Sequence, residues 1–202
     1  METIFIPAKS KAEINSDKIK AISAELPKKI AIAYSIQFKE IAGQIEKMLS
    51  KKHKITKTLQ ILGCSKPNFS KDTQAILLIG SGKFHAIALA IETKKQVYVL
   101  EENKLIKISK KEIRDFESSK KGAYMRFLNS STIGILISAK PGQQNLKRAL
   151  NLKLKDKEKY FFISNEINTN EFENFSEIGS WVNTACPRMD MNDSRIVNVR
   201  EV

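Results

Sequence analysis

The sequence predicts an α/β protein made of two consecutive small parallel-sheet (βαβ) domains flanked by helices. Three observations lead to this fold class: strands of continuous apolar residues, helices that alternate with those strands, and a length of 202 residues. Continuous apolar runs are typical of strands buried on both faces of a parallel sheet. Domains run roughly 100 to 150 residues, so this length accommodates one large core or two small ones.

The elements of the first half follow one another in a regular order. TIFI at residues 3–6 is expected to form a buried strand that ends at Pro7. Residues 12–26 carry apolar side chains at helical spacing until Pro27 ends the helix. The other expected elements are a strand at 29–34, a helix after Ser35 as its cap, a short strand near 55, a loop at 65–73, a strand at 75–79, a helix at 84–95, a strand at 96–100, a polar connection and a basic helix at 110–128.

The pattern begins again at Thr132. The expected elements there are a strand at 132–139, a turn at 140–144, a helix to about Leu154, a strand at 160–164, a short helix at 171–175 and a strand at 180–185. Phe161, Phe162 and Trp181 are expected in the core. We expect a first domain over residues 1–120, which carries Cys64, and a second over residues 121–202, which carries Cys186.

The net charge is +13, from 35 basic and 22 acidic residues. The lysines are spread in pairs, with no arginine cluster and no interleaved aromatic residues, which favours a solvated basic surface over a dedicated nucleic-acid groove. Such a surface still favours docking onto an acidic or RNA-bound partner. No apolar run approaches the roughly 20 residues that a bilayer requires, and no signal peptide is recognised, so we expect a cytoplasmic protein without membrane contact.

Cys64 in ILGC and Cys186 in TACPR are the two cysteines of the chain. Each follows a hydrophobic stretch and has Gly or Pro beside it, and open α/β sheets gather ligands in such loops at strand carboxyl ends. Thiols stay reduced inside cells, so a disulfide between them is not expected. A small buried hydrophobe is a sufficient explanation for Cys64, but it explains Cys186 poorly because Pro187, Arg188 and Asp190 follow.

Several chemistries remain open for these thiols. Two sulfurs cannot complete a tetrahedral zinc or an iron–sulfur site. His85 could add an imidazole to give a Cys, Cys, His zinc site, whereas His53 in KKHK is expected on the solvated surface. Nucleophilic catalysis by a cysteine with His85 and Asp190 or Asp193 has no supporting signature.

The turn at Gly80, Ser81 and Gly82 lies between an apolar strand and a helix. Unpaired backbone N–H groups and the helix dipole at such a place suit an anion. A tight structural turn explains the same residues equally well, because the full dinucleotide motif is absent.

Several segments together resemble the diphthamide synthase family. They are TIFIPA (3–8), KKIAIAYSIQ (28–37), QILGC (60–64), ILLIGSGKFHAIALAIETKKQV (76–97), GILISAKPGQ (134–143) and ACPRMDMND (185–193). They occur in the family's order and at similar spacings over essentially the whole chain. The resemblance implies an enzyme that cleaves S-adenosylmethionine with a [4Fe–4S] cluster. It would transfer a 3-amino-3-carboxypropyl group to a histidine of translation elongation factor two and release methylthioadenosine.

The resemblance also implies roles for individual residues. Cys64 and Cys186 would be cluster ligands. The pocket for S-adenosylmethionine would be lined by Gln37, Gly80, Ser81, Gly82 and His85. Arg188 and Asp190 would tune or orient the cluster as neighbours of its ligand, although for Arg188 a salt bridge that fixes its loop is an equal alternative.

The family's first domain, with the first of three cysteines, should precede TIFIPA. A split enzyme, a degenerate relative and a truncated chain would each account for this difference. We favour a split enzyme in which a separate first-domain subunit supplies the third cysteine and packs near Ile4 and Ile6. Self-association into a homo-oligomer is a further possibility. The alternatives are a non-catalytic binding module and a zinc-binding α/β protein.

Overall fold

The structure is a computed structural model that describes residues 4, 6, 8–11, 13–62, 65–191, 193–200 and 202. It divides into two compact units, Met1–Ile113 and Arg114–Val202. Each unit is built on parallel strands with flanking helices, which confirms the predicted fold class.

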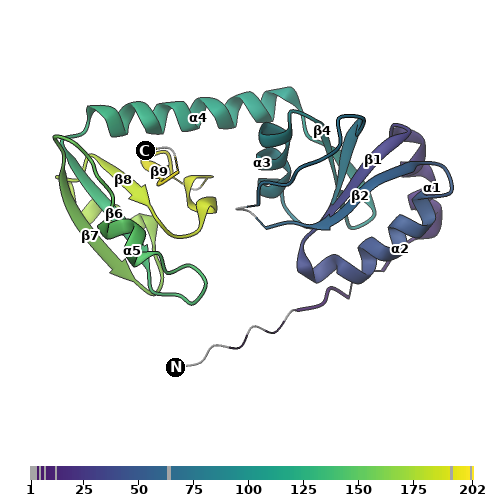
Figure 1. The fold of residues 1–202 in the computed structure, drawn as a ribbon, viewed down its shortest axis with the longest axis horizontal. Helices are drawn as coiled ribbons and strands as arrows, with labels where there is room; N and C mark the ends of the chain where they lie inside the picture. Colours follow the sequence, from purple (N-terminus) through teal and green to yellow (C-terminus); the bar gives the residue numbers. More distant parts are fainter. Residues whose placement is uncertain are drawn as a thin grey trace. The chain divides into compact units, whose positions relative to one another are not determined.

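The first unit has a five-stranded sheet in the order β2-β1-β3-β4-β5 (Figure 1). The strands β1 to β4 pair in parallel, and β5 is antiparallel to β4. Its elements are α1 (Ser16–Glu25), β1 (Lys29–Tyr34), η1 (Ile36–Phe38), α2 (Lys39–Leu49), β2 (Lys54–Gln60), β3 (Ala75–Ile79), α3 (Phe84–Thr93), β4 (Gln96–Glu101) and β5 (Lys104–Lys107).

Continuous apolar sequences place β1 and β3 at the centre of this sheet. All five residues of β3, AILLI, are buried, as are the four inner residues of β1. Alternate residues of β1, Ile30 and Ile32, pack with α1 and α2 in one core cluster, which includes Ile19 and Ile45. Helix α3 packs against β4. The carboxyl ends of the parallel strands therefore form one edge of a well-packed sheet.

The second unit has a four-stranded, fully parallel sheet in the order β7-β6-β8-β9. Its elements are α4 (Lys110–Asn129), which begins in the first unit, β6 (Thr132–Ser138), α5 (Leu146–Leu150), β7 (Glu158–Ser164), η2 (Thr169–Asn174), β8 (Ser180–Asn183), η3 (Pro187–Met191) and β9 (Ile196–Asn198). Within the described ranges, none of the helices is long and apolar enough to cross a membrane.

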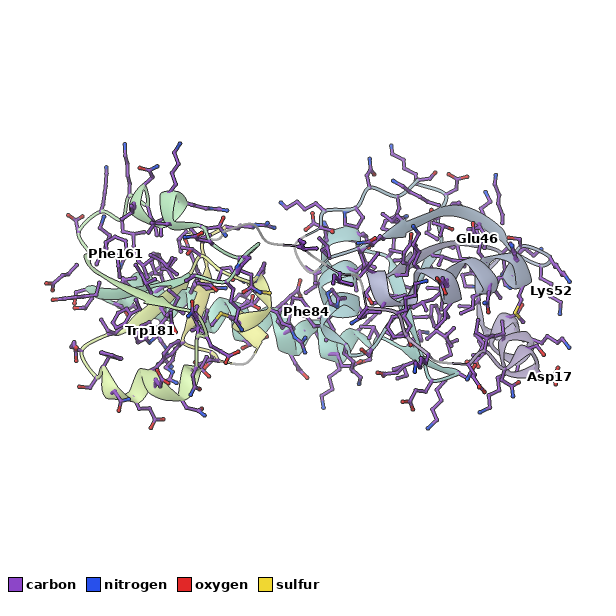
Figure 2. The ribbon with its side chains drawn as sticks, turned by 90° about the horizontal axis from the view of Figure 1, so that it is seen from below. Asp17, Glu46, Lys52, Phe84, Phe161 and Trp181 are labelled. Atoms are coloured by element: carbon purple, nitrogen blue, oxygen red, sulfur yellow. The ribbon has the colours of Figure 1, made fainter. Side chains whose placement is uncertain are left out.

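Trp181 of β8 forms the centre of an aromatic cluster in the second unit (Figure 2). Its ring stacks on Phe172 with a centroid distance of 4.0 Å, and the Phe162 ring meets it edge-on at 4.7 Å. Gly134 of β6 is the register partner of Trp181. A Cβ atom on Gly134 would lie 2.4 Å from Trp181 Cε3, so this position requires glycine.

Several predicted details are wrong. Ile4 and Ile6 lie outside any strand and are 84% and 85% exposed, and Phe161 is 41% exposed rather than in the core. The remaining residues of the expected strand at 3–6 lie outside the described residues. The helix after β6 has five residues and ends at Leu150, and the strands β5 and β9 were not predicted.

The prediction for His53 is also wrong. Its side chain is buried against α1 and not on the solvated surface. The ring lies between Ser23 Oγ, 2.7 Å from Nε2, and the carbonyl oxygen of Pro27, 2.8 Å from Nδ1. A carbonyl can only accept, so Nδ1 carries a proton. His53, which directly precedes β2, thus connects α1 to the start of that strand.

Candidate functional site

The carboxyl ends of β1, β3 and β4 form the first candidate site, because parallel strands end at the same edge. Ser35 follows β1 and donates its backbone N–H to Ile79 O at 3.4 Å. Gly80 follows β3 and donates to Leu100 O at 3.5 Å. The backbone of the glycine turn is therefore joined to both neighbouring strand ends.

Gln37 lies at the same edge as Gly80. It belongs to η1, and its Oε1 accepts a hydrogen bond from Ser35 Oγ at 3.2 Å. The same hydroxyl would be 3.6 Å from a Cβ atom placed on Gly80. Ser35 thus brings together two residues that the sequence places in one pocket.

The glycine turn has a defined geometry. Gly82 has φ +78°, a left-handed conformation that side chains rarely tolerate. Its N–H donates to Glu101 Oε1, at the end of β4, at 3.2 Å. One backbone donor that was predicted to face an anion is therefore taken by a carboxylate of the chain itself, close to the start of α3.

His85 is in the first turn of α3 and is partly buried. Its ring meets the Phe84 ring edge-on with centroids 5.2 Å apart. Lys83, which precedes the helix, forms an ion pair with Glu112 Oε1 at 2.5 Å. The turn is thus held at both ends, by Glu101 and by Glu112.

Cys186 marks the second candidate site, at the carboxyl end of the second sheet. Its thiol is free and partly exposed, in the turn between β8 and η3. Thr184 anchors this turn to β6, because its N–H and its Oγ1 both donate to Leu136 O, at 3.1 and 2.8 Å. The sequence therefore predicted the place of Cys186 at a strand end correctly.

Two asparagines organise the backbone around Cys186. Asn183 Nδ2 donates to Cys186 O at 2.8 Å and to Asn198 Oδ1 at 2.7 Å. Asn198, the last residue of β9, in turn donates to Pro187 O at 3.0 Å and to Asp190 Oδ2 at 2.7 Å. Buried amide side chains therefore fix the backbone of the loop that carries Cys186.

Asp190 is 8% exposed and also forms an ion pair with Lys120 of α4, with Nζ 3.4 Å from Oδ2. Asp190 thus connects helix α4 to the asparagines under the Cys186 loop. Arg188 is exposed, and it forms no ion pair within the part of the chain that the structure describes. The salt bridge considered for Arg188 is therefore not found there.

Asp193 binds Arg195, with Arg195 Nη2 2.6 Å from Oδ2 and Nε 3.0 Å from Oδ1. Burial works to raise the pKa of Asp193, but hydrogen bonds from the Arg195 side chain and backbone outweigh it and lower the pKa overall. Both carboxylates considered for nucleophilic catalysis are thus already bound to other side chains.

The donor set fits a metal cluster only in part. Cys64 lies outside the described residues. Among those that are described, no group of three His, Cys, Asp or Glu side chains is placed to hold a metal ion. An accessible thiol on an ordered loop suits a ligand, but two cysteines leave a [4Fe–4S] cluster short of protein ligands.

The sequence did not single out Asn183, Asn198, Lys120 or Glu101. A signal was present for the asparagines, because WVN and IVN each place one amide directly after two buried apolar residues of a strand. Lys120 and Glu101 carry no comparable signal, since both stand among other charged residues.

Together the fold and the two candidate sites define a tandem parallel α/β protein whose candidate ligand residues lie at strand carboxyl ends. The family described as "Putative diphthamide synthesis protein" matches residues 1–198. The chain therefore belongs to the diphthamide synthesis protein family.

Two relatives carry the name 2-(3-amino-3-carboxypropyl)histidine synthase. The protein of Pyrococcus horikoshii is 28% identical over 138 residues, which cover 66% of this chain and 40% of the relative. That of Methanocaldococcus jannaschii is 26% identical over 212 residues, which cover 96% and 57%. The chain thus spans about half the length of these curated relatives.

Two solved structures share the fold. The crystal structure of Dph2 from Pyrococcus horikoshii matches 96% of this chain and 62% of its own, with TM-score 0.78 and 21% identity. The structure of the same protein with a 4Fe-4S cluster matches 92% and 58%, with TM-score 0.73 and 24% identity. Both similarities establish the architecture.

Proposed function

We propose that this chain is part of a [4Fe–4S]-dependent enzyme that cleaves S-adenosylmethionine and transfers its 3-amino-3-carboxypropyl group to a histidine of translation elongation factor two. The observation that carries the proposal is the family match over residues 1–198. The relatives named as histidine synthases and the neighbour that holds a 4Fe-4S cluster support it.

In this proposal Cys64 and Cys186 are cluster ligands. The partly exposed thiol and fixed loop of Cys186 are consistent with that role. When bound, the cluster supplies an electron for the reductive cleavage of a carbon–sulfur bond. Arg188 is exposed two residues after Cys186 and adds a positive charge to this loop, while Asp190 acts on the loop through Asn198.

The strand-end edge of the first unit is the proposed pocket for S-adenosylmethionine, with Gln37, Gly80, Ser81, Gly82 and His85 as lining residues. The backbone there is compact enough for a ligand to approach closely, because Gly80 and Gly82 carry no side chain. Glu101 brings a negative charge to the turn, which suits the sulfonium and ammonium groups of this ligand better than its carboxylate.

The donor count leads us to include a second chain in the proposal. A cluster held by two thiolates keeps two irons without protein sulfur and is expected to be labile. We therefore propose that a separate first-domain subunit supplies the third cysteine. The exposed Ile4 and Ile6 are candidate contacts for it, since large exposed apolar residues favour burial in an interface.

The test is co-expression with a small protein that carries the first-domain cysteine, followed by anaerobic reconstitution. We expect a brown complex that converts S-adenosylmethionine to methylthioadenosine and labels elongation factor two on histidine. The variant Cys186→Ser should lose the cluster and product formation. Ser180→Ala, a change at the amino end of the same strand that leaves the sulfur intact, is the matched control and should keep both.

A parent complex that takes up no iron under these conditions would refute the proposal. The rival function is a binding module that docks on an acidic or RNA-bound partner through the basic surface, which the charge of +13 favours. That function predicts unchanged binding to elongation factor two when both cysteines are replaced by serine. It also predicts an affinity that falls steeply with added salt.

A further inference from the structure

The two amides beneath Cys186 have every hydrogen-bonding group engaged. Asn183 uses both Nδ2 hydrogens, on Cys186 O and Asn198 Oδ1, and its own Oδ1 accepts the Ala185 N–H at 2.9 Å. Asn198 repeats the arrangement. It donates to Pro187 O and Asp190 Oδ2 and accepts from Asn183.

The direction of each amide follows from its partners. Backbone carbonyls and carboxylates accept hydrogen bonds and do not donate, so the NH₂ groups of both asparagines must face them. The result is a chain of hydrogen bonds that runs from Cys186 O through Asn183 and Asn198 to the Asp190 carboxylate. At its end, the Lys120 ammonium group forms an ion pair with this carboxylate, with Nζ 3.4 Å from Asp190 Oδ2.

This chain is buried. Asn183 is 1% exposed, Asn198 is 6% exposed and Asp190 is 8% exposed. Buried polar groups stabilise one arrangement when they are hydrogen-bonded, as all the polar side-chain atoms of both amides are, and the low dielectric strengthens each bond. Aliphatic side chains would stabilise this end of the sheet equally well. The burial of amides therefore indicates that the Cys186 loop requires their hydrogen bonds.

We propose that Asn183 and Asn198, with Asp190 and Lys120 behind them, are positioning residues that fix the direction of the Cys186 side chain before any metal is bound. The carbonyls of Cys186 and Pro187 both accept hydrogen bonds from the network, so the backbone at Cys186 is fixed, and with it the direction of the Cα–Cβ bond. Preorganised ligands of this kind bind more tightly and exclude alternative geometries. The proposal rests on the function proposed for Cys186.

The informative variant is Asn198→Asp, which keeps the size of the side chain. A carboxylate at this position cannot donate to Pro187 O, and it faces the Asp190 carboxylate. Loss of a hydrogen bond to a charged group should increase opening of the loop by about tenfold.

Two readouts measure that opening without a cluster. The full chain in a Cys64→Ser background contains one thiol, so its alkylation by iodoacetamide at fixed pH reports Cys186 alone. Hydrogen exchange at Ala185 and Met189 reports the loop backbone, because their N–H groups bond Asn183 Oδ1 and Cys186 O. We expect both rates to rise about tenfold in Asn198→Asp.

Matched variants separate positioning from general stability. Ser180→Ala removes a buried hydroxyl of β8 that bonds Arg195 O and does not touch the loop. It should leave both rates unchanged. Adding Asp190→Asn to Asn198→Asp restores one amide and one carboxylate in contact, and should return the rates towards those of the parent.

Should Asn198→Asp fail to fold, Lys120→Met decides the question, since it removes the charge that pairs with Asp190 and leaves both amides in place. It should raise Met189 exchange roughly threefold, as expected for such an ion pair. Unchanged rates in the folded network variants, or equal acceleration in Ser180→Ala, would overturn the proposal. If the variants loosen the loop but the complex never takes up iron, the role of the asparagines in fixing the loop still holds. That result would refute the proposed transferase function instead.

Discussion

Glu112 and Lys83 form an ion pair with 2.5 Å between Oε1 and Nζ. It joins the first turn of α4 to the residue that follows the Gly80–Gly82 turn. The other carboxylate oxygen accepts from the N–H and the hydroxyl of Ser109, at 2.9 and 2.7 Å. Ser109 Oγ in turn accepts the Glu112 N–H at 3.2 Å, so the two residues form a capping box.

This arrangement predicts a pH-dependent stability. The hydrogen bond from Lys83, followed by those from Ser109, lowers the pKa of Glu112 from 4.5 to about 2. Because the folded pKa is depressed, the stabilisation is present above pH 4.5 and is lost as pH falls towards 2. Glu112→Gln keeps the cap geometry and removes the charge. It should cost about 0.5 to 1 kcal/mol at pH 7, since Lys83 is half exposed.

Urea unfolding of parent and Glu112→Gln at several pH values measures this difference. The gap between the two should close as pH is lowered from 4.5 to about 2. Glu117→Gln is the control for removing a carboxylate from the same helix. An equal gap at pH 7 and near pH 2 would contradict the assignment.

Gly134→Ala should destabilise the second unit strongly. The added methyl group would lie 2.4 Å from Trp181 Cε3, and the ring is stacked on Phe172 and cannot move away easily. We expect a loss of about 1 to 3 kcal/mol, as for other overpacked cores. Trp181 is the single tryptophan and lies in this unit, so its fluorescence reports the unfolding directly.

Gly122→Ala is the matched control for Gly134→Ala. Gly122 lies within α4, and a Cβ atom there meets nothing within 4 Å. Alanine favours the helix by up to about 1 kcal/mol over glycine, so this variant should be more stable than the parent. Destabilisation of similar size in both variants would show that the Trp181 contact is not the cause.

Lys157→Met should loosen the end of α4. The Lys157 ammonium donates to Phe127 O, Leu128 O and Ser130 O at 2.9, 3.0 and 2.6 Å, and lies 5.0 Å from the centre of the Phe127 ring. Lys157 therefore donates hydrogen bonds to carbonyl groups that have no partner within the helix. Its positive charge also interacts favourably with the negative C-terminal end of the helix dipole. The expected loss is about 1 to 2 kcal/mol by tryptophan fluorescence. Lys155→Met, at an exposed position nearby, should change stability little.

Ser23→Ala should destabilise the first unit through His53. Removing the hydroxyl leaves Nε2 of a buried ring without the partner it has at 2.7 Å. The expected cost is about 1 to 3 kcal/mol. Hydrogen exchange of α1 and β1 measures it, with exposed Ser16→Ala as the control. Unchanged exchange in Ser23→Ala would mean that the His53 contact contributes nothing to stability.

The elements that the sequence predicted well are those whose signal is local. AILLI and KIAIAY are long apolar runs between polar loops, and both form the expected strands. The strands β5 and β9 have four and three residues, too few for a periodic pattern. Glu102 and Asn103 have positive φ and form the tight turn between β4 and β5. Asn103 was the residue that could have indicated this turn, because Asn tolerates positive φ.

The errors arise where distant contacts decide. KKHK gives no indication that His53 is buried, because its partners Ser23 and Pro27 come from another element. YFFIS has the composition of a central strand, but β7 is the outer strand of its sheet, so Phe161 is exposed. The place of Cys186 at a strand end could be predicted, whereas the asparagines beneath it depend on the pairing of β8 with β9.

The outer strand β7 has a practical consequence. Tyr160, Phe161 and Ile163 are 45%, 41% and 64% exposed, beside a row of backbone groups that no further strand of the sheet covers. Such edges recruit strands from other molecules. Concentrated solutions of the isolated chain are therefore expected to aggregate through this segment, and Phe161→Lys is the first change to try for keeping the protein monodisperse.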